Sequence, residues 1–306
     1  MMTCIESLLP SNNKMNQPPT PLRNISDTAF LVATYREIES ERPDAIFKDP
    51  YAALLSGDHG RRIVKSFNGN KNHSWFLVAR TSILDGWILE LIKSQNIDTV
   101  LNLAAGLDTR AYRLNLPTTL KWYDVDLPEI LSYKENQLAP YKPNCILEYV
   151  KLNLADVSAR NLLFKKIAGE SQNTLVVSEG FLMYLTPEIA ASLAKDLSQF
   201  PQFKYWLAEL LGPYQLRWIK LKWGKQFEQA NAVMNFAPAE GPDFFIPCGW
   251  NPEKFKSSLL EAVRLKRAPL GAKLLTSIRI LLPKFLVKRL NTAGIALMKN
   301  SKDKRI

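Results

Sequence analysis

The sequence predicts an α/β fold with a doubly wound, mostly parallel sheet. Apolar runs typical of buried strands recur along the middle of the chain, at 99–104, 120–125, 146–152, 174–179 and 204–210. Helical segments separate these runs, at 108–114, 128–138, 157–168 and 187–198. Strands that alternate with helices favour a parallel sheet covered on both faces. Because ligands on such sheets bind beyond the carboxyl ends of the strands, the loops after the strands are the candidate site.

The chain length fits one large α/β domain with additions at both ends. Its 306 residues can bury a sizeable core. We divide a single domain, 25–306, into an N-terminal helical part (25–95), a core (96–211) and a C-terminal part (212–306). Residues 1–24 are rich in Asn, Pro and Ser, which predicts a disordered lead-in.

The N-terminal part is expected to be helical. A helix is expected over Thr28–Glu39, with Ser26 or Asp27 as the residue that caps its N-terminus. Two proline-containing turns and a short helix follow, in ERPDAIFKDPYAALL. After a polar loop at 68–72, a helical period extends over 73–93.

The C-terminal part departs from the alternating pattern. Helices are expected over Tyr214–Met234 and Pro252–Ala262, with an aromatic loop, GPDFFIPCGW, between them. The stretch 272–290 has an apolar face and a basic face, and Pro283 breaks it or begins a second helix.

Nearly all of the net charge of +11 lies near the C-terminal end. From Glu261 onward there are twelve Lys and Arg residues and two acids. We interpret this segment as a helix packed on the domain with a solvated basic face. A weak peripheral contact with anionic lipid is a second interpretation. Nucleic-acid binding is not expected, because the motifs and interleaved aromatic residues that it uses are missing.

Composition argues against several other classes of protein. The three cysteines have no CxxC spacing and there are only two histidines, so neither a metal site nor a disulfide framework is expected. No apolar run approaches 18 residues, and the N-terminus lacks the basic and apolar regions of a signal peptide. These features favour a cytoplasmic protein.

The stretch Thr99–Asp126 is the centre of the functional interpretation. Its strand is followed by small residues ending in Gly106, which let the backbone approach a ligand closely. Asp126 ends the next strand, twenty residues later, where an acid is placed to bind a ribose diol. A dinucleotide fingerprint has three glycines and this turn has one. Alone, the stretch predicts a generic nucleotide-binding unit, and Asp126 could equally be a turn residue.

Two further charged residues stand out. Glu179 follows a wholly apolar strand, where an acid should have a partner. Arg80 lies in the helical segment 73–93, and an ion pair with Asp85 is an alternative to a role in binding.

Several segments, taken together, resemble the leucine carboxyl methyltransferase family. They are TAFLVATYREIESERPDAIFKDPYA, VARTSILDG, VLNLAAGLDTRAYRL, YDVDLPEIL and SEGFLMYLTPE, in the family's order from about Thr28 to Glu188. The resemblance is to the bacterial branch, which includes O-methyltransferases of the polyketide type. It implies a class I methyltransferase fold with a Rossmann-like, seven-stranded sheet, one of whose last strands is antiparallel. It also implies the cofactor S-adenosyl-L-methionine.

The resemblance assigns roles at the strand ends. Arg80 would hold the methionine carboxylate of the cofactor, and Glu179 would face its amino group. Gly106, with its neighbour Ala105, would pass close to the methionyl and ribose portion. Asp126, followed by Leu127, would accept both ribose hydroxyls.

Two departures from the family pattern concern this site. Asn153 and Leu154 would flank the adenine, where family members commonly have Asp-Leu, so this chain brings an acceptor without a charge. Eukaryotic members also place a lysine ahead of the DPY motif to clamp the cofactor carboxylate. This chain has Asp44 there, with Lys48 nearby, so Arg80 alone is expected to fill that role.

The predicted activity is O-methylation of a small-molecule acceptor by in-line displacement. A carboxylate acceptor is already ionised at neutral pH and needs no general base, and no histidine lies in the motifs. Tyr184, Arg110 and Arg113 are candidates to orient it, although the helical position of both arginines favours a structural role for them. The sequence does not distinguish a carboxylate from a hydroxyl acceptor. Methylation of a protein C-terminal carboxylate and a non-catalytic, cofactor-binding scaffold are the alternatives.

Overall fold

The computed structural model describes residues 22–67, 74–269, 271 and 293–303. Within these residues the strands form one seven-stranded sheet in the order β3-β2-β1-β4-β5-β7-β6. Strand β7 is antiparallel to both of its neighbours, whereas β1 to β5 pair in parallel. The predicted fold class is confirmed. The strands are β1 (Thr99–Leu103), β2 (Lys121–Asp126), β3 (Ile146–Lys151), β4 (Thr174–Ser178), β5 (Phe203–Leu210), β6 (Trp250–Ser257) and β7 (Gly294–Asn300).

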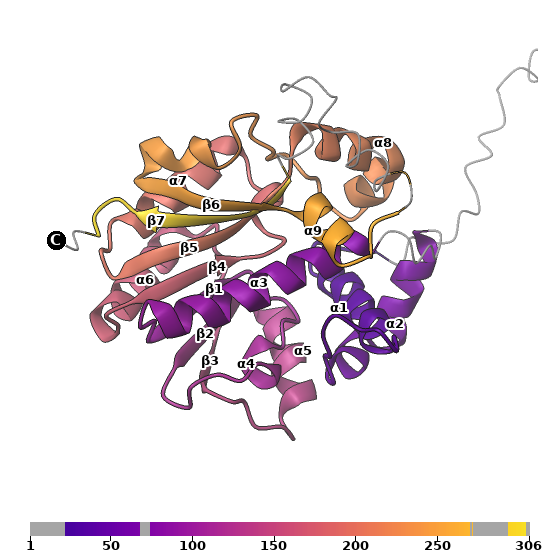
Figure 1. The fold of residues 1–306 in the computed structure, drawn as a ribbon, viewed down its shortest axis with the longest axis horizontal. Coiled ribbons are helices and arrows are strands. Elements are labelled where there is room, and N and C mark those ends of the chain that lie inside the picture. Colours follow the sequence, from indigo (N-terminus) through magenta and orange to yellow (C-terminus); the bar gives the residue numbers. More distant parts are fainter. Residues whose placement is uncertain (1–21, 68–73, 270, 272–292, 304–306) are drawn as a thin grey trace, which may run out of the picture.

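Helices cover both faces of the sheet. One hydrophobic cluster packs α3, α4 and α5 against one face, and a second packs α6, α7 and the 3-10 helix η3 against the other. In Figure 1, α3 to α5 lie in front of the strands and α6 and α7 lie behind them. The helices are α1 (Asp27–Ser40), α2 (Ala52–Ser66), α3 (Trp75–Ser94), α4 (Arg110–Arg113), α5 (Pro128–Leu138), α6 (Val157–Glu170), η2 (Leu182–Tyr184), α7 (Pro187–Ser198), α8 (Pro213–Gln229), η3 (Gly241–Cys248) and α9 (Ser258–Arg264).

The central strands are apolar because helices bury both of their faces. Every residue of β1 and of β4 is buried. Along β1, Val100 packs into the first cluster, whereas Leu101 and Leu103 pack into the second. A strand buried on both sides has a continuous apolar sequence instead of an alternating one. The edge strand β3 is half-exposed, as its mixed sequence requires.

The predicted helix Pro252–Ala262 is wrong in its first half. Strand β6 occupies Trp250–Ser257 and pairs antiparallel with β7, and α9 begins only at Ser258. The register shifts between Pro252 and Lys254, a place where an edge strand tolerates proline. The predicted aromatic loop before β6 is mostly the 3-10 helix η3, and the helix expected over Tyr214–Met234 ends at Gln229.

Some of the sequence predictions concern segments that the structure does not describe. The polar loop at 68–72, the amphipathic basic stretch at 272–290 and most of the predicted lead-in lie outside the described residues. Leu22 is buried against Ile63 and Phe67, so packed structure is present before the predicted boundary at residue 24.

Among the described residues, no helix has both the length and the apolar character needed to cross a membrane.

Helices α1 and α2 form an extension that meets the end of the sheet. They pack closely on each other, and Figure 1 shows them together at the end of the molecule to which the parallel strands point.

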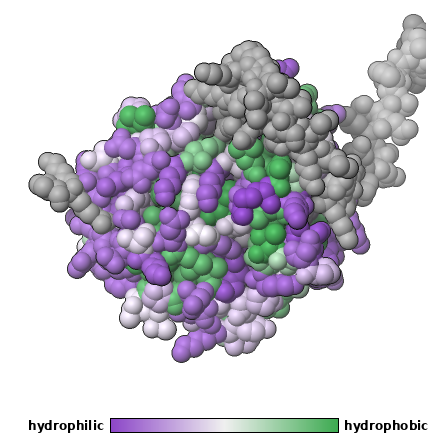
Figure 2. All heavy atoms as spheres, viewed as in Figure 1, coloured by the Kyte–Doolittle hydropathy of each residue, from purple (hydrophilic) through white to green (hydrophobic). Residues whose placement is uncertain are grey.

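The face shown in Figure 2 is mostly hydrophilic, with smaller groups of apolar side chains between the polar ones.

Candidate functional site

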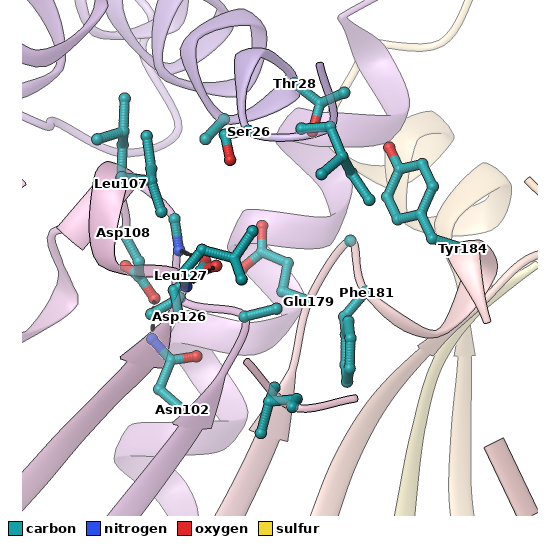
Figure 3. A pocket seen from close by; sticks show the side chains of 18 of the residues that line it. Ser26, Thr28, Asn102, Leu107, Asp108, Asp126, Leu127, Glu179, Phe181 and Tyr184 are labelled. Carbon is teal, nitrogen blue, oxygen red and sulfur yellow. Dashed lines mark hydrogen bonds between the residues drawn. The ribbon is translucent and has the colours of Figure 1, made fainter. Parts of the chain in front are cut away.

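A cavity of about 320 Å³ lies at the carboxyl ends of the parallel strands, a size suited to a small organic ligand. Its walls are the loops after β1 to β4 and one side of α1 (Figure 3). Tyr184 also lines it, whereas Arg110 and Arg113 do not. All the residues predicted to bind the cofactor line this cavity: Arg80, Ala105, Gly106, Asp126, Leu127, Asn153, Leu154 and Glu179.

Asp126 and the turn at Gly106 form the floor of the cavity. Gly106 has a φ of +47°, which favours glycine, and its N–H donates to Asp126 Oδ2 at 2.7 Å. The N–H of Leu127 donates to the other oxygen at 2.7 Å. Burial raises the pKa of Asp126, while these two N–H donors oppose the rise. Each carboxylate oxygen keeps a further lone pair, so the group can still accept hydrogen bonds from a diol.

A buried polar network supports this floor from below. The Lys134 ammonium is fully buried and lies 2.7 Å from Asp124 Oδ2. Asn102 donates to Asp124 at 2.9 Å and to Asp108 at 3.1 Å, which connects β2 to the loop after β1. Buried polar groups of this kind need partners, and here each is satisfied by another member of the network. No sequence pattern predicted this network.

Arg80 is buried on α3 between two carboxylates. Its Nε lies 2.8 Å from Glu179 Oε1, and its Nη1 donates to Glu209 Oε2 at 2.7 Å. The alternative ion pair with Asp85 is wrong, because Asp85 binds Arg110 and Arg113 instead. Burial would lower the pKa of Arg80, but the charges of Glu209 and Glu179 raise it.

Arg110 and Arg113 are held by the protein's own carboxylates. Arg110 lies 2.6 Å from both Asp85 and Glu179 and 2.8 Å from Asp108. Arg113 donates to both oxygens of Asp85, at 2.6 and 2.8 Å. Since both guanidinium groups are buried and neither residue lines the cavity, this placement favours the structural interpretation over acceptor binding.

The loop after β3 is held by hydrogen bonds from the side chains of Asn153 and Arg160. The side chain of Asn153 accepts the N–H of Ala155 at 3.0 Å, so its oxygen shapes the turn. Arg160 donates to the carbonyl of Leu154 at 3.2 Å and forms an ion pair with Asp196 on α7. Sequence reasoning did not identify Arg160, which lines the cavity.

Glu209 was also missed, although the sequence carried a signal for it. Glu209 follows the apolar run 205–208 inside the predicted strand 204–210, as Glu179 follows the run 175–177 and Ser178, and the argument that a buried acid needs a partner applies to both. Tyr184 stands on the other side of the cavity from Asn102 and Asp108, near Thr28 (Figure 3). Burial raises its pKa to about 12.

Comparison with known proteins places this geometry in a family. The model of the leucine carboxyl methyltransferase family matches residues 29–198, more than half of the chain. The chain belongs to this family. The segment contains all but the first two residues of α1, the strands β1 to β4 and the loops after them, and therefore most of the cavity wall.

Curated relatives match over a similar part of the chain. A protein of Parafrankia sp., provisionally named an S-adenosyl-L-methionine-dependent methyltransferase, is 31% identical over 57% of this chain and 59% of its own length. A protein of the same provisional name from Saccharopolyspora erythraea is 32% identical over 54% of this chain and 60% of its own length. The chain thus matches about three fifths of the length of these relatives.

Solved structures share the fold over nearly the whole chain. A DUF574 family protein from Streptomyces avermitilis superposes with a TM-score of 0.57, covering 92% of this chain and 98% of its own, at 12% identity. A provisionally named methyltransferase from Thermobifida fusca gives a TM-score of 0.56 over 92% and 96%, at 13% identity. At these identities the likeness is one of fold.

Proposed function

We propose that the chain is an S-adenosyl-L-methionine-dependent O-methyltransferase whose acceptor is the carboxylate of a small molecule. The observation that carries the proposal is the arrangement of Asp126, Glu179 and Arg80 around one cavity in a chain of this family. These three groups suit a diol, an ammonium and a carboxylate, which are the polar features of this cofactor.

Each of these residues, and the pair Asn153–Leu154, suits one part of the cofactor. Asp126 would accept the ribose hydroxyls, and Asn153 with Leu154 would border the adenine. Glu179 would accept the ammonium. Arg80 has its Nε beside Glu179 and its Nη1 on Glu209, and Nη2 has no hydrogen-bonding partner among the described residues. That free nitrogen suits the carboxylate of the methionine portion. When bound, the cofactor would supply a methyl group on a sulfonium for in-line displacement.

The ionisable residues of the cavity favour a carboxylate acceptor. Its lining includes no His, Lys or Cys among the described residues, and its three carboxylates already have partners: Asp108 pairs with Arg110, Asp126 accepts two backbone N–H groups, and Glu179 pairs with two arginines. His59 instead forms a pair with Asp27 at 2.8 Å, outside the lining. Tyr184 has a pKa of about 12, so it is a hydrogen-bond donor at neutral pH and a poor general base. A hydroxyl acceptor needs a base, whereas a carboxylate needs only orientation, for which Tyr184 is our candidate.

Calorimetry tests cofactor binding directly. We expect S-adenosylmethionine and S-adenosylhomocysteine to bind the full chain with one site, because both present the diol, ammonium and carboxylate groups. Methylthioadenosine, which lacks the ammonium and carboxylate, should bind more weakly. If the folded protein bound none of the three, the proposal would be wrong.

The acceptor requires a separate assay. Labelled S-adenosylmethionine would be incubated with matched pairs of small carboxylic acids and phenols, and with a peptide ending in a free leucine carboxylate. We expect label on the small carboxylic acids. Transfer only to phenols, or only to the peptide, would contradict the proposed acceptor. Cofactor binding without transfer to any of them would favour a non-catalytic role.

A further inference from the structure

Glu209 is brought beside Glu179 by the sheet itself. Strands β4 and β5 are parallel neighbours, and Ser178 pairs with Ala208 in their register. The next residues along the chain, Glu179 directly after β4 and Glu209 within β5, therefore come at the same edge of the sheet. Both side chains are largely buried, with 13% of Glu179 and 6% of Glu209 exposed.

One oxygen of Glu209 connects two parts of the site. Glu209 Oε2 accepts from Arg80 Nη1 at 2.7 Å and from the N–H of Gly180 at 2.7 Å. Gly180 directly follows Glu179 and has a φ of +64°, a conformation that favours glycine. The carboxylate therefore fixes both the guanidinium of Arg80 and the turn that carries Glu179.

The two glutamates differ in their electrostatic surroundings. Burial raises the pKa of Glu209, and the neighbouring charge of Glu179 adds to the rise, although Arg80 opposes it. Burial also opposes ionisation of Glu179, but Arg110 and Arg80 lower its pKa overall. Among the described residues, Glu179 pairs with two guanidinium groups, those of Arg80 and Arg110, whereas Glu209 pairs with that of Arg80 alone.

We infer that Glu209 is a positioning residue: it holds Arg80 so that Nη2, which has no partner among the described residues, is presented to the carboxylate of a bound amino-acid moiety. The inference rests on the proposed cofactor. It predicts that Glu209 contributes to affinity for the amino-acid part of the ligand and not for the adenosine part.

A pair of ligands separates these contributions. S-adenosylhomocysteine has both parts, whereas methylthioadenosine lacks the ammonium and the carboxylate. Glu209→Gln keeps the size of the side chain and one oxygen acceptor but removes the charge that orients Arg80. We expect the Kd of S-adenosylhomocysteine to rise about tenfold or more, because hydrogen bonds between charged groups carry that share of affinity. The Kd of methylthioadenosine should change by less than about twofold.

Asp196→Asn provides the matched control. Asp196 holds Arg160, which donates to the carbonyl of Leu154 at the expected adenine side. Loosening this side should weaken both ligands by similar factors, because both contain adenosine. Each variant thus removes the charge of one buried carboxylate. Glu209→Gln should raise the Kd of S-adenosylhomocysteine much more than that of methylthioadenosine, whereas Asp196→Asn should raise both by similar factors.

Each outcome decides between the inference and the proposed function. An equal loss of affinity for both ligands in Glu209→Gln, or no loss for either, would overturn the positioning role while leaving the proposed function intact. Failure of the wild-type chain to bind either ligand would overturn both. If Glu209→Gln does not fold, Glu209→Asp, which keeps the charge and shortens the side chain, is measured with the same two ligands and the same criteria.

Discussion

At the scale of single residues, Asp126 supports the turn and is also our candidate ribose ligand. Asp126→Asn keeps one oxygen acceptor for Gly106 or Leu127, whereas Asp126→Ala leaves both N–H groups without it. We expect Asn to weaken S-adenosylhomocysteine binding about tenfold and Ala about a hundredfold, since charged hydrogen bonds contribute about 1.5–3 kcal/mol. Calorimetry measures the affinities, and circular dichroism checks that both variants remain folded. An unchanged dissociation constant in both would remove Asp126 from the site.

Sequence patterns identified the candidate residues better than they identified their partners. Glu179 was expected to have a partner because a buried acid after an apolar strand needs one, and it has Arg80 and Arg110. The partner of Arg80 was not predictable by spacing. Asp85 lies five positions away along the chain, yet Glu209, 129 positions away, receives the hydrogen bond. Pairing across the sheet, and not proximity in sequence, decides such contacts.

At the scale of elements, the contact between the Gly106 turn and α1 closes one wall of the cavity. A Cβ at position 106 would lie 3.1 Å from Ala29 Cβ, and the positive φ adds strain for any other residue. We expect Gly106→Ala to lower the free energy of unfolding by about 1–3 kcal/mol. Gly86→Ala is the control, because Gly86 lies within α3 with open space around its Cβ position. That change should stabilise the chain by about 0.5–1 kcal/mol. Urea denaturation measures both, and equal effects would contradict the proposed strain.

The sequence predicts correctly those elements whose own residues carry a clear pattern, such as a continuous apolar run. β1 and β4 are apolar throughout because helices cover both faces, and their apolar runs were visible directly. β6 has no such run. It forms because β7, which begins 37 residues after β6 ends, pairs with it at the edge of the sheet. Strand propensity depends on such neighbours, which explains why a helix was predicted there.

At the scale of the whole molecule, buried charge connects the N-terminal helices to the sheet. Arg36 on α1 forms an ion pair with Asp49 at 2.8 Å and donates to the carbonyl of Leu107 in the loop after β1. Through Arg80 and Arg110, α3 and α4 are held to the ends of β4 and β5. The site is therefore built where separate elements meet, and its charges contribute to the stability of the fold as well as to ligand binding.

This coupling predicts how stability depends on pH. The pKa of Asp108 is lowered, because Arg110 and Lys134 outweigh the effect of burial, and that of Glu179 is lowered by Arg110 and Arg80. A carboxylate with a lowered pKa stabilises the fold above its ordinary pKa, and this contribution is lost as the pH falls. Glu209 and Asp126 have raised pKa values, so their contribution has the opposite sign, but each keeps donors that limit it. We therefore expect the melting temperature to fall as the pH decreases below about 4.5, the ordinary value for Glu.

Asp108→Asn tests the origin of this loss. Removing one partner of a buried ion pair costs about 3–5 kcal/mol, so the variant should be less stable than the wild type at pH 7. Because Asp108 no longer titrates, acidification should remove less stability from the variant, so the melting temperatures of the two proteins should begin to converge below about pH 4 and continue to converge as the pH falls toward 2. The same difference in melting temperature at pH 7 and at pH 2 would show that Asp108 does not carry the acid sensitivity. Thermal unfolding followed by circular dichroism, at constant ionic strength, makes the comparison.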